Sequence, residues 1–314
     1  MNNTIKIDTR IPRGVLCIGV SIAIVFYLIV GAHAEPLPSL TMEEAYPDLA
    51  RGVLKSGRLI SLDDGLVLTA GNVRIDRFTL DETISTSKPE LREQMQKNLL
   101  FVLEQYATRK LLFHEAYAAG YRDNEPEEKI IMKYLVEKAA GVTVSEEEVS
   151  SFYAQAKDSM GGVPFEQVKE ILKQHLLQQA QQRAIRAHVL TVGQRFDIRI
   201  DAEWVKAQSL LARDNPVDRA RGSGRPTMVE FGATGCIPCD MMQPILANLR
   251  KKYTDRLNVV FVHVGQEQIL GARYGIQSIP VQAFFDAAGR EVFRHTGFYP
   301  QVEIEKKLSD MGVR

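Results

Sequence analysis

Cysteine and tryptophan are scarce in this chain, which has three cysteines and one tryptophan among its 314 residues. So few cysteines exclude a scaffold held together by many disulfides. An excess of charge is also absent, because Lys and Arg together number 39 and Asp and Glu together number 39. This balance gives no reason to expect nucleic-acid binding or attraction to an acidic partner.

Several familiar catalytic patterns are missing as well. The sequence contains no glycine-rich phosphate loop, no Ser-His-Asp order and no nucleic-acid-binding motif. What it does contain is apolar material, since 45% of the residues are hydrophobic and 25% are charged. A globular chain of this length and composition has enough apolar material for two ordinary domains.

The first 34 residues predict export from the cytoplasm. Three basic residues, an apolar stretch and a small-residue cleavage motif follow one another: Lys6, Arg10 and Arg13, then residues 15–30, then Ala32-His33-Ala34. This order is typical of a cleaved Sec-type signal. Because roughly 20 apolar residues span a bilayer, residues 15–31 could instead stay as a tether to the inner membrane. In both cases the rest of the chain is expected to be periplasmic or otherwise extracytoplasmic.

Cleavage of this signal would leave only two cysteines, Cys236 and Cys239, because Cys17 lies within the signal. An exported protein whose cysteines form a single C-x-x-C motif is expected to use that pair chemically. Zinc is the alternative ligand for such a motif, but a structural zinc site needs four ligands. The sequence has no second Cys or Cys/His pair, so we predict no metal.

Residues 76–195 have the apolar spacing of helices, and we predict an all-helical module there, preceded by a leader with short strands at 35–75. A stripe from Leu91 to Tyr106 predicts one long helix between Pro89 and Gly120. Three more helices are expected from their N-terminal signals, which are Pro126, the Ser145 and Glu148 capping box, and Pro164.

Two phrases of this module resemble the N-terminal helical domain of SurA and parvulin-type chaperones. They are Asn72-Val73-Arg74-Ile75-Asp76, followed by a long helix containing 109–116, and Val144-Ser145-Glu146-Glu147-Glu148-Val149, followed by Phe152-Tyr153. The resemblance covers roughly residues 65–200 and implies binding of unfolded protein. Because residues 160–164 connect two helices where the family usually has an isomerase domain, prolyl isomerase activity is not implied. The module could equally be a structural or dimerisation element.

From residue 196 onward, strands and helices alternate. Apolar runs predict strands at 196–200, 228–233, 259–264, 281–285 and 291–296, with helices expected at 202–212, 236–253, 267–274 and 301–311 and a polar loop at 215–225. This order predicts an α/β domain, with a central mixed sheet covered by helices on both faces. The whole chain is therefore expected to be an α+β protein of two domains.

The order of elements in residues 196–314, with the cysteines at a strand-to-helix junction, resembles the thioredoxin superfamily. Three phrases carry the resemblance: Val229-Glu230-Phe231 before the C-x-x-C, Tyr274-Gly275-Ile276-Gln277-Ser278-Ile279-Pro280, and Gly297 after the last strand. The family's tryptophans near the motif are replaced here by Gly232 and Gly235. The resemblance implies a redox-active Cys236–Cys239 disulfide and no other cofactor.

The resemblance also implies a role for each residue of the site. Cys236, at the start of a helix whose dipole stabilises a thiolate, would be the nucleophile, and Cys239 would resolve the mixed disulfide. Glu230 stands where the family usually has a buried aspartate and could take the proton of Cys239, or it could be an edge carboxylate that meets water. Pro280 is expected to be cis, unless it is an ordinary turn proline.

The substrate would lie in a groove beside Ile279 and Pro238, which is more open than in a cytosolic thioredoxin. We therefore expect an exported thiol-disulfide oxidoreductase that acts on exported proteins carrying thiols or disulfides. Without a histidine between the cysteines, a reductase or isomerase supplied by a membrane electron donor is favoured over an oxidase. The alternative is a periplasmic chaperone or assembly factor that uses the thioredoxin fold as a binding platform.

Overall fold

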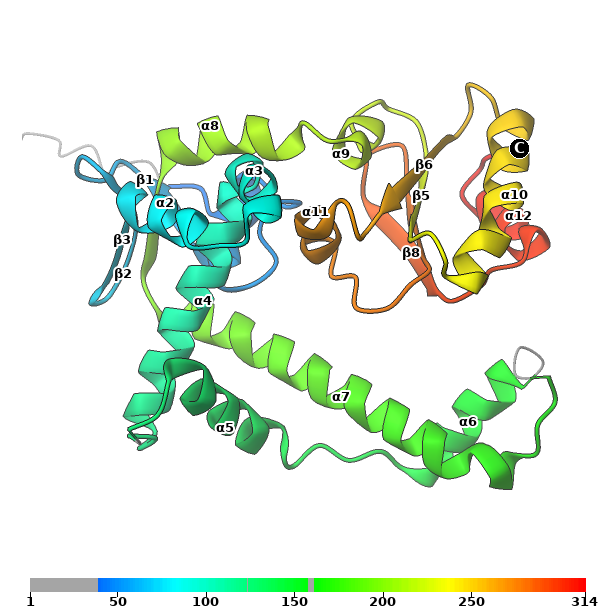
Figure 1. Ribbon diagram of the computed structural model, residues 1–314, viewed down its shortest axis with the longest axis horizontal. Helices are drawn as coiled ribbons and strands as arrows, with labels where there is room; N and C mark the ends of the chain where they lie inside the picture. The colour runs from blue at the N-terminus through cyan, green and yellow to red at the C-terminus, as the bar shows by residue number, and fades with distance from the viewer. Residues whose placement is uncertain (1–38, 123, 158–160) are drawn as a thin grey trace, which may run out of the picture. The chain divides into compact units, whose positions relative to one another are not determined.

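The computed structural model describes residues 39–122, 124–157 and 161–314 (Figure 1). The predicted export signal and the tether at 15–31 lie outside the described residues. Within these ranges no helix combines the length and the apolar character needed to cross a membrane. The described residues form one compact unit.

The N-terminal part of this unit combines a small sheet with a set of helices (Figure 1). Its strands have the spatial order β1-β4-β2-β3, with bounds β1 Arg58–Ile60, β2 Leu66–Ala70, β3 Val73–Asp76 and β4 Ile198–Asp201. Its helices are α1 Met42–Ala45, the 3₁₀ helix η1 Val53–Ser56, α2 Arg77–Ser85, α3 Pro89–Lys97, α4 Leu99–Ala118, α5 Glu127–Ala139, α6 Glu146–Ala156, α7 Phe165–Arg195 and α8 Ala202–Arg213. In the described part of residues 77–195 every element is a helix, as predicted for the helical module, and the strands of the sheet come from the segments before and after it.

Strand β4 and helix α8 correct the expected domain boundary at residue 196. Strand β4 pairs in parallel with β1 and antiparallel with β2. Ile198, Ile200 and Trp204 are buried in the core that the N-terminal helices share with this sheet. The described part of the expected leader, residues 39–75, therefore contributes strands to a folded sheet, and β4 completes that sheet instead of opening the next domain.

The predicted helix from Pro89 to Gly120 is in fact two helices, α3 and α4, which meet at Asn98. The backbone of Asn98 leaves the helical region, with φ −127° and ψ 40°. Its side-chain amide donates to the carbonyl oxygen of Gln94 at 2.7 Å and its Oδ1 accepts from Arg273 at 2.9 Å. Such side-chain bonds offer the backbone an alternative to continuing the helix.

The other three predicted helices are confirmed. Helix α5 follows Pro126, and α7 follows Pro164 and runs to Arg195. Helix α6 begins with the expected capping box, in which the Ser145 hydroxyl accepts from the Glu148 N–H and the Glu148 carboxylate accepts from the Ser145 N–H. Sequence signals at helix N-termini were therefore sufficient to place these elements.

The C-terminal part is a mixed sheet with helices on both faces, as predicted (Figure 1). Its strands have the order β6-β5-β7-β8, with bounds β5 Thr227–Gly232, β6 Asn258–His263, β7 Val281–Phe285 and β8 Glu291–Thr296. Its helices are α9 Pro216–Arg221, α10 Ile237–Lys252, α11 Gln268–Arg273 and α12 Gln301–Asp310. Strand β5 is parallel to β6 and antiparallel to β7, so it is central and buried along its whole length.

Helix α9 occupies the segment that was expected to be a polar loop. Asn215 caps it, because its Oδ1 accepts from the N–H groups of Val217 and Asp218, both at 3.0 Å. Pro216 stands at the start of the helix, where its missing N–H has no cost. Neither of these helix-start signals was recognised from the sequence, because the segment is rich in charged residues and was interpreted as a loop.

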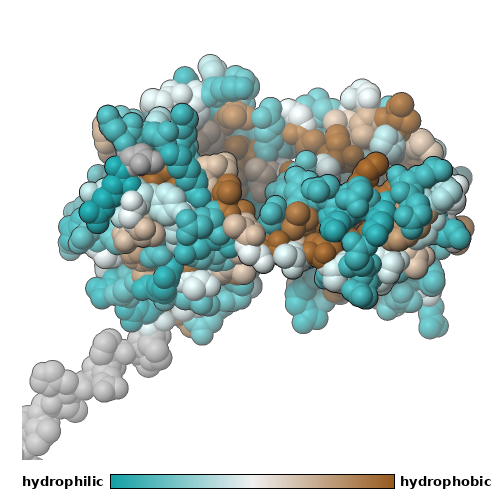
Figure 2. Space-filling model, turned by 90° about the horizontal axis from the view of Figure 1, so that it is seen from below, coloured by the Kyte–Doolittle hydropathy of each residue, from teal (hydrophilic) through white to brown (hydrophobic). Residues whose placement is uncertain are grey.

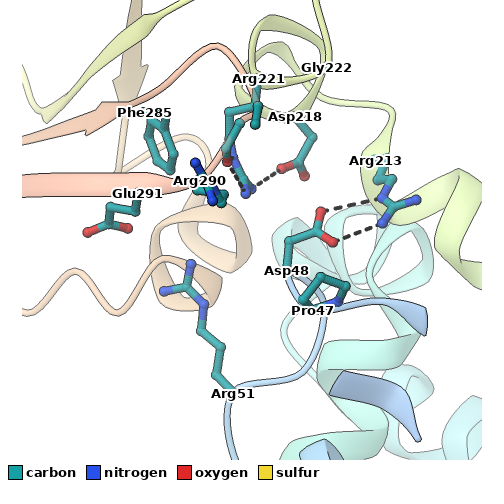
Figure 3. A pocket seen from close by; sticks show the side chains of 12 residues that line it. Pro47, Asp48, Arg51, Arg213, Asp218, Arg221, Gly222, Phe285, Arg290 and Glu291 are labelled. Atoms are coloured by element: carbon teal, nitrogen blue, oxygen red, sulfur yellow. Dashed lines mark hydrogen bonds and ion pairs between the residues drawn. The ribbon is translucent and has the colours of Figure 1, made fainter. Parts of the chain in front are cut away.

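A polar pocket of about 540 Å³ lies beside α9 (Figure 3). Its charged groups are largely paired with one another. Asp218, which is buried, accepts from Arg221 at 3.0 Å, from Arg273 at 3.1 Å and from the Tyr274 hydroxyl at 2.6 Å. The same carboxylate also accepts from Nδ2 of Asn215 at 2.6 Å. Because one carboxylate satisfies donors from four residues, we interpret this cluster as a structural network rather than a ligand site.

Replacement of Asp218 by alanine is expected to lower the free energy of unfolding by about 3–5 kcal/mol, because two guanidinium groups lose their buried partner. Chemical denaturation measures this loss. Asp214→Ala, which removes the exposed ion pair with Arg219, is the matched control and should cost less than about 1 kcal/mol. Equal effects of the two substitutions would contradict the network interpretation.

Candidate active site

The cysteine pair lies at the junction between the central strand and the following helix. Strand β5 ends at Gly232, and Cys236 is the N-cap residue of α10, with extended backbone angles. Cys236 and Cys239 are joined by a disulfide, with their Cα atoms 5.2 Å apart. Cys239 is fully buried, whereas Cys236 is only partly buried. An incoming sulfur atom can therefore reach Cys236 and not Cys239.

The start of α10 favours a thiolate at Cys236. The first N–H groups of a helix have no partner within the helix, and together with the helix dipole they stabilise negative charge. Pro238, in the first turn, removes one of these donors without interrupting the helix. The same arrangement lowers the pKa of N-terminal cysteines in general, which makes the nucleophilic form available near neutral pH.

Gly232 makes room for the disulfide against the sheet. A Cβ atom at this position would lie 3.1 Å from Cε2 of Phe261, 3.4 Å from Cβ of Cys239 and 3.5 Å from its Sγ. A side chain here would press on the buried sulfur. Gly235, with φ of +79°, then lets the loop turn from β5 into α10 through a conformation that favours glycine.

Glu230 lies on β5, is fully buried, and is therefore not an edge carboxylate. It stands two residues before Gly232, on the same face of the strand, which Cys239 covers. Glu230 and Cys239 therefore lie on the same side of the sheet. Burial raises the pKa of Glu230 to about 8, and a hydrogen bond from Gln282 opposes this rise.

Pro280 follows a cis peptide bond, as predicted. It immediately precedes β7, in which Val281 pairs with Phe231 of β5. The Ile279–Pro280 bond therefore lies at the end of the sheet from which the chain leaves for Cys236. The Pro280 carbonyl accepts from the N–H of Gly297 at 2.8 Å, which anchors the segment to the end of β8.

Apolar side chains are exposed near the cysteines. Ile237 is 76% exposed and Met241, one turn further along α10, is 51% exposed. A hollow of about 300 Å³ is lined by residues that include Ile276 and Ile279. Solvent-exposed apolar groups around a reactive pair are suited to binding an unfolded segment of another chain.

Two residues of the site were not identified from the sequence. Gln282 is fully buried and donates from Nε2 to Oε2 of Glu230 at 2.8 Å. His263 accepts through Nε2 from the N–H of Thr234 at 3.1 Å and so holds the loop before Cys236. The available signal for Gln282 was a polar residue within the otherwise apolar run 281–285.

A disulfide at the start of a helix, next to the central strand of a mixed sheet and above a buried acid, defines a site for thiol-disulfide exchange. Residues 214–312 match the family model described as a thioredoxin-like domain. Through these residues the chain belongs to the thioredoxin-like family. The match begins after α8, in agreement with the observed pairing of β4.

Relatives support this assignment. The chain is 32% identical over 103 residues to a thioredoxin of Alicyclobacillus acidocaldarius, covering 33% of this chain and 97% of that protein. It is 34% identical over 106 residues to the chloroplastic thioredoxin-like protein HCF164 of Oryza sativa, covering 33% of this chain but only 40% of the relative. It is also 27% identical over 128 residues to a thiol:disulfide interchange protein TxlA homolog of Synechocystis, covering 40% of this chain and 71% of the relative. The C-terminal domain is thus related to thiol-disulfide oxidoreductases, while the resemblance of residues 65–200 to SurA stays a prediction.

Proposed function

We propose that this chain is an exported thiol-disulfide oxidoreductase that acts outside the cytoplasm on proteins carrying thiols or disulfides. The observation that carries the proposal is the disulfide between an accessible Cys236 and a buried Cys239, next to the buried acid Glu230. A domain used only as a binding platform has no need of this combination. Reduction of insulin disulfides by the full chain, with a small dithiol as electron source, tests it directly.

The proposed reaction moves two electrons from the protein dithiol to a substrate disulfide. The Cys236 thiolate attacks one substrate sulfur, so that the substrate S–S bond breaks, a mixed disulfide forms and the first substrate thiolate leaves. Glu230 then takes the proton of Cys239, whose thiolate attacks Sγ of Cys236. This second exchange releases the second substrate thiolate and leaves the Cys236–Cys239 disulfide, with Glu230 protonated.

Electron flow toward substrate is favoured by the residues between the cysteines. Ile237 and Pro238 carry no charge, whereas strong oxidants of this family have a histidine there that stabilises the reduced form. A reductase or isomerase must be re-reduced after each cycle. A membrane electron donor is the proposed source of electrons. The export signal or tether would place the domain outside the cytoplasm, where cytoplasmic reductants cannot reach it.

The reduction potential of the Cys236/Cys239 couple is expected to lie closer to about −270 mV, the value of thioredoxin, than to about −120 mV, the value of the strong oxidant DsbA. Equilibration with glutathione or dithiothreitol, followed by alkylation of free thiols, measures it. A potential near that of DsbA would reverse the proposed direction of electron flow.

The substrate is proposed to bind as an extended segment beside Ile279 and Pro280, with apolar side chains resting on Ile237 and Met241. The exposure of these two side chains supports the proposal. Pro238 lies between the cysteines and has no backbone N–H. The first turn of α10 therefore offers a substrate one hydrogen-bond donor fewer. Unfolded exported proteins, which present both apolar segments and cysteines, fit such a surface.

The N-terminal helices are proposed to bind or position the same substrates. Large apolar side chains are well exposed there, among them Met132 at 63% and Val136 at 61% on α5, and Ile171 at 69% on α7. Figure 2 shows hydrophobic residues exposed in separate groups among hydrophilic ones on the face seen from below. These side chains also support the alternative function, a periplasmic chaperone or assembly factor.

The full chain with both active-site cysteines replaced by serine is expected to slow aggregation of an unfolded exported protein, because the exposed apolar side chains do not depend on the disulfide. Light scattering of a reduced client at 1:1 and higher ratios checks this. A prolyl peptide assay on the same sample should give the uncatalysed rate. No effect on scattering would indicate that the helices serve only as a spacer or dimerisation arm. Measurable isomerisation would contradict the prediction that this chain lacks a prolyl isomerase domain.

A further inference from the structure

Glu230 and Gln282 form an isolated polar pair inside the sheet. They are register partners on the neighbouring strands β5 and β7, and both side chains are fully buried. Met228 and Phe284, also buried, form the next pair along these strands on the same face. The carboxyl group and the amide group therefore have no access to water, and each must supply hydrogen bonds to the other.

The hydrogen bonds of the pair are incomplete if Glu230 is ionised. Gln282 donates from Nε2 to Oε2 of Glu230 at 2.8 Å. Oε1 of Glu230 and Oε1 of Gln282 are both buried without a hydrogen-bond partner. Two oxygen atoms are thus left as acceptors with no donor, and each buried unsatisfied group costs about 1–3 kcal/mol.

A single proton on Glu230 satisfies both oxygens. A protonated carboxyl group has one O–H donor, and a primary amide has both a donor and an acceptor. The neutral acid can therefore donate to the amide oxygen while accepting from the amide N–H, so that two parallel hydrogen bonds join the planar groups. An ionised carboxylate, which only accepts, can make just one of them.

We propose that Gln282 is a positioning residue that pairs with the neutral form of Glu230 and holds its proton while the cysteines are in the disulfide state. This inference rests on the proposed oxidoreductase function, because the proton is the one that Cys239 gives up when the disulfide forms. When a donor thiolate later opens the disulfide at Cys236, Cys239 leaves as a thiolate and takes the proton back from Glu230. The O–H bond of the acid breaks and the S–H bond of Cys239 forms.

The groups that face the pair leave this proton undisturbed. Phe261 stands opposite Glu230 on β6, and Cys239 covers the same face from α10. His295, on β8, is the register partner of Gln282; burial lowers its pKa, its Nε2 lies 3.2 Å from the carbonyl oxygen of Phe298, and Tyr299 stacks on it. Burial therefore favours the neutral form of His295. The residues of α12 that enter this core, Ile304 and Leu308, are apolar.

Infrared spectroscopy of the disulfide form at pH 6.5 tests the proposal, because a neutral carboxyl group has a C=O stretch where ionised carboxylates do not absorb. We expect this band in the wild type, its loss in Glu230→Gln, and its shift to higher wavenumber in Gln282→Met, in which the acid loses both hydrogen bonds. Gln301→Met, on the surface helix α12, is the matched control and should leave the band unchanged. Gln282→Leu, checked for folding by near-ultraviolet circular dichroism, replaces the methionine variant if that variant does not fold.

A second measurement excludes a purely structural role of Gln282. The rate at which dithiothreitol reduces the disulfide is followed against pH, and we expect the midpoint of the profile to move in Gln282→Met and to stay in Gln301→Met. A wild type without the neutral-carboxyl band, or a band and midpoint unmoved by Gln282→Met, would overturn the proposal even if insulin reduction is normal. A chain that shows the band and its shift but never reduces insulin would refute the oxidoreductase function and leave the acid–amide pair intact.

Discussion

Replacement of Cys236 by serine is expected to reduce insulin reduction to the rate of the small dithiol alone. Of the two sulfur atoms in the disulfide, an incoming substrate disulfide can reach that of Cys236 at the start of α10, because Cys239 is fully buried. A serine hydroxyl keeps the N-cap geometry but is not a nucleophile at neutral pH. Circular dichroism should be unchanged, and turbidity of the precipitating insulin B chain measures the activity.

The variant Cys239→Ala serves as the matched control for this prediction. It keeps the nucleophile and removes the resolving thiol, so it should accumulate mixed disulfides with its substrates through Cys236. Non-reducing electrophoresis detects these adducts. Capture by Cys236→Ala but not by Cys239→Ala would reverse the two roles, and full insulin reduction by Cys236→Ser would contradict the proposed enzyme.

The parts of the site that lie close together in the sequence could be predicted from it. The C-x-x-C pair, the helix that begins at it and the strand before it are one continuous segment, and local patterns determine each of them. Pro280 and the strand after it are likewise adjacent in the sequence. The resemblance to the thioredoxin superfamily implied that Glu230 is a buried acid rather than an edge carboxylate, and its full burial in the structure agrees.

Pairings between distant segments could not be predicted in the same way. The run at 196–200 is a strand, as expected, but its apolar pattern fits either domain. Its pairing with β2 and with β1, whose register partners lie 141 residues earlier in the chain, decides between them. The contact of Gln282 with Glu230 depends on the register of β7 against β5. Register across a sheet is set by the whole hydrophobic pattern and the turns, not by any single residue.

Close packing also imposed requirements that the sequence did not reveal. A Cβ atom on Gly193 of α7 would lie 2.6 Å from the backbone oxygen of Val53, so the helix approaches the η1 segment closely only because this residue is glycine. Within a helix pattern such a glycine has no distinctive signal. The role of this glycine is recognised only from the structure, in which the two segments, far apart in the sequence, pack against each other.

The buried acid makes the stability of the protein depend on pH in a defined direction. The pKa of Glu230 is about 8 in the folded chain, against an ordinary value of 4.5. Between these values the folded state keeps a proton that the unfolded state has lost, so the free energy of unfolding falls as pH rises. The contribution is fully present below pH 4.5 and is lost as the pH approaches and passes 8. Its size is on the order of 4 to 5 kcal/mol.

Glu230→Gln is expected to remove this dependence, because glutamine resembles the protonated acid, can pair with Gln282 and does not titrate. Urea unfolding of the disulfide form at pH 5 and at pH 8.5 measures the effect, and the difference between wild type and variant cancels the other titrating groups. The free energy of unfolding of the variant minus that of the wild type should be several kcal/mol larger at pH 8.5 than at pH 5. A difference that stays constant across this range would mean that Glu230 titrates normally in the folded protein, and the acid would then be unable to store the proton that Cys239 releases.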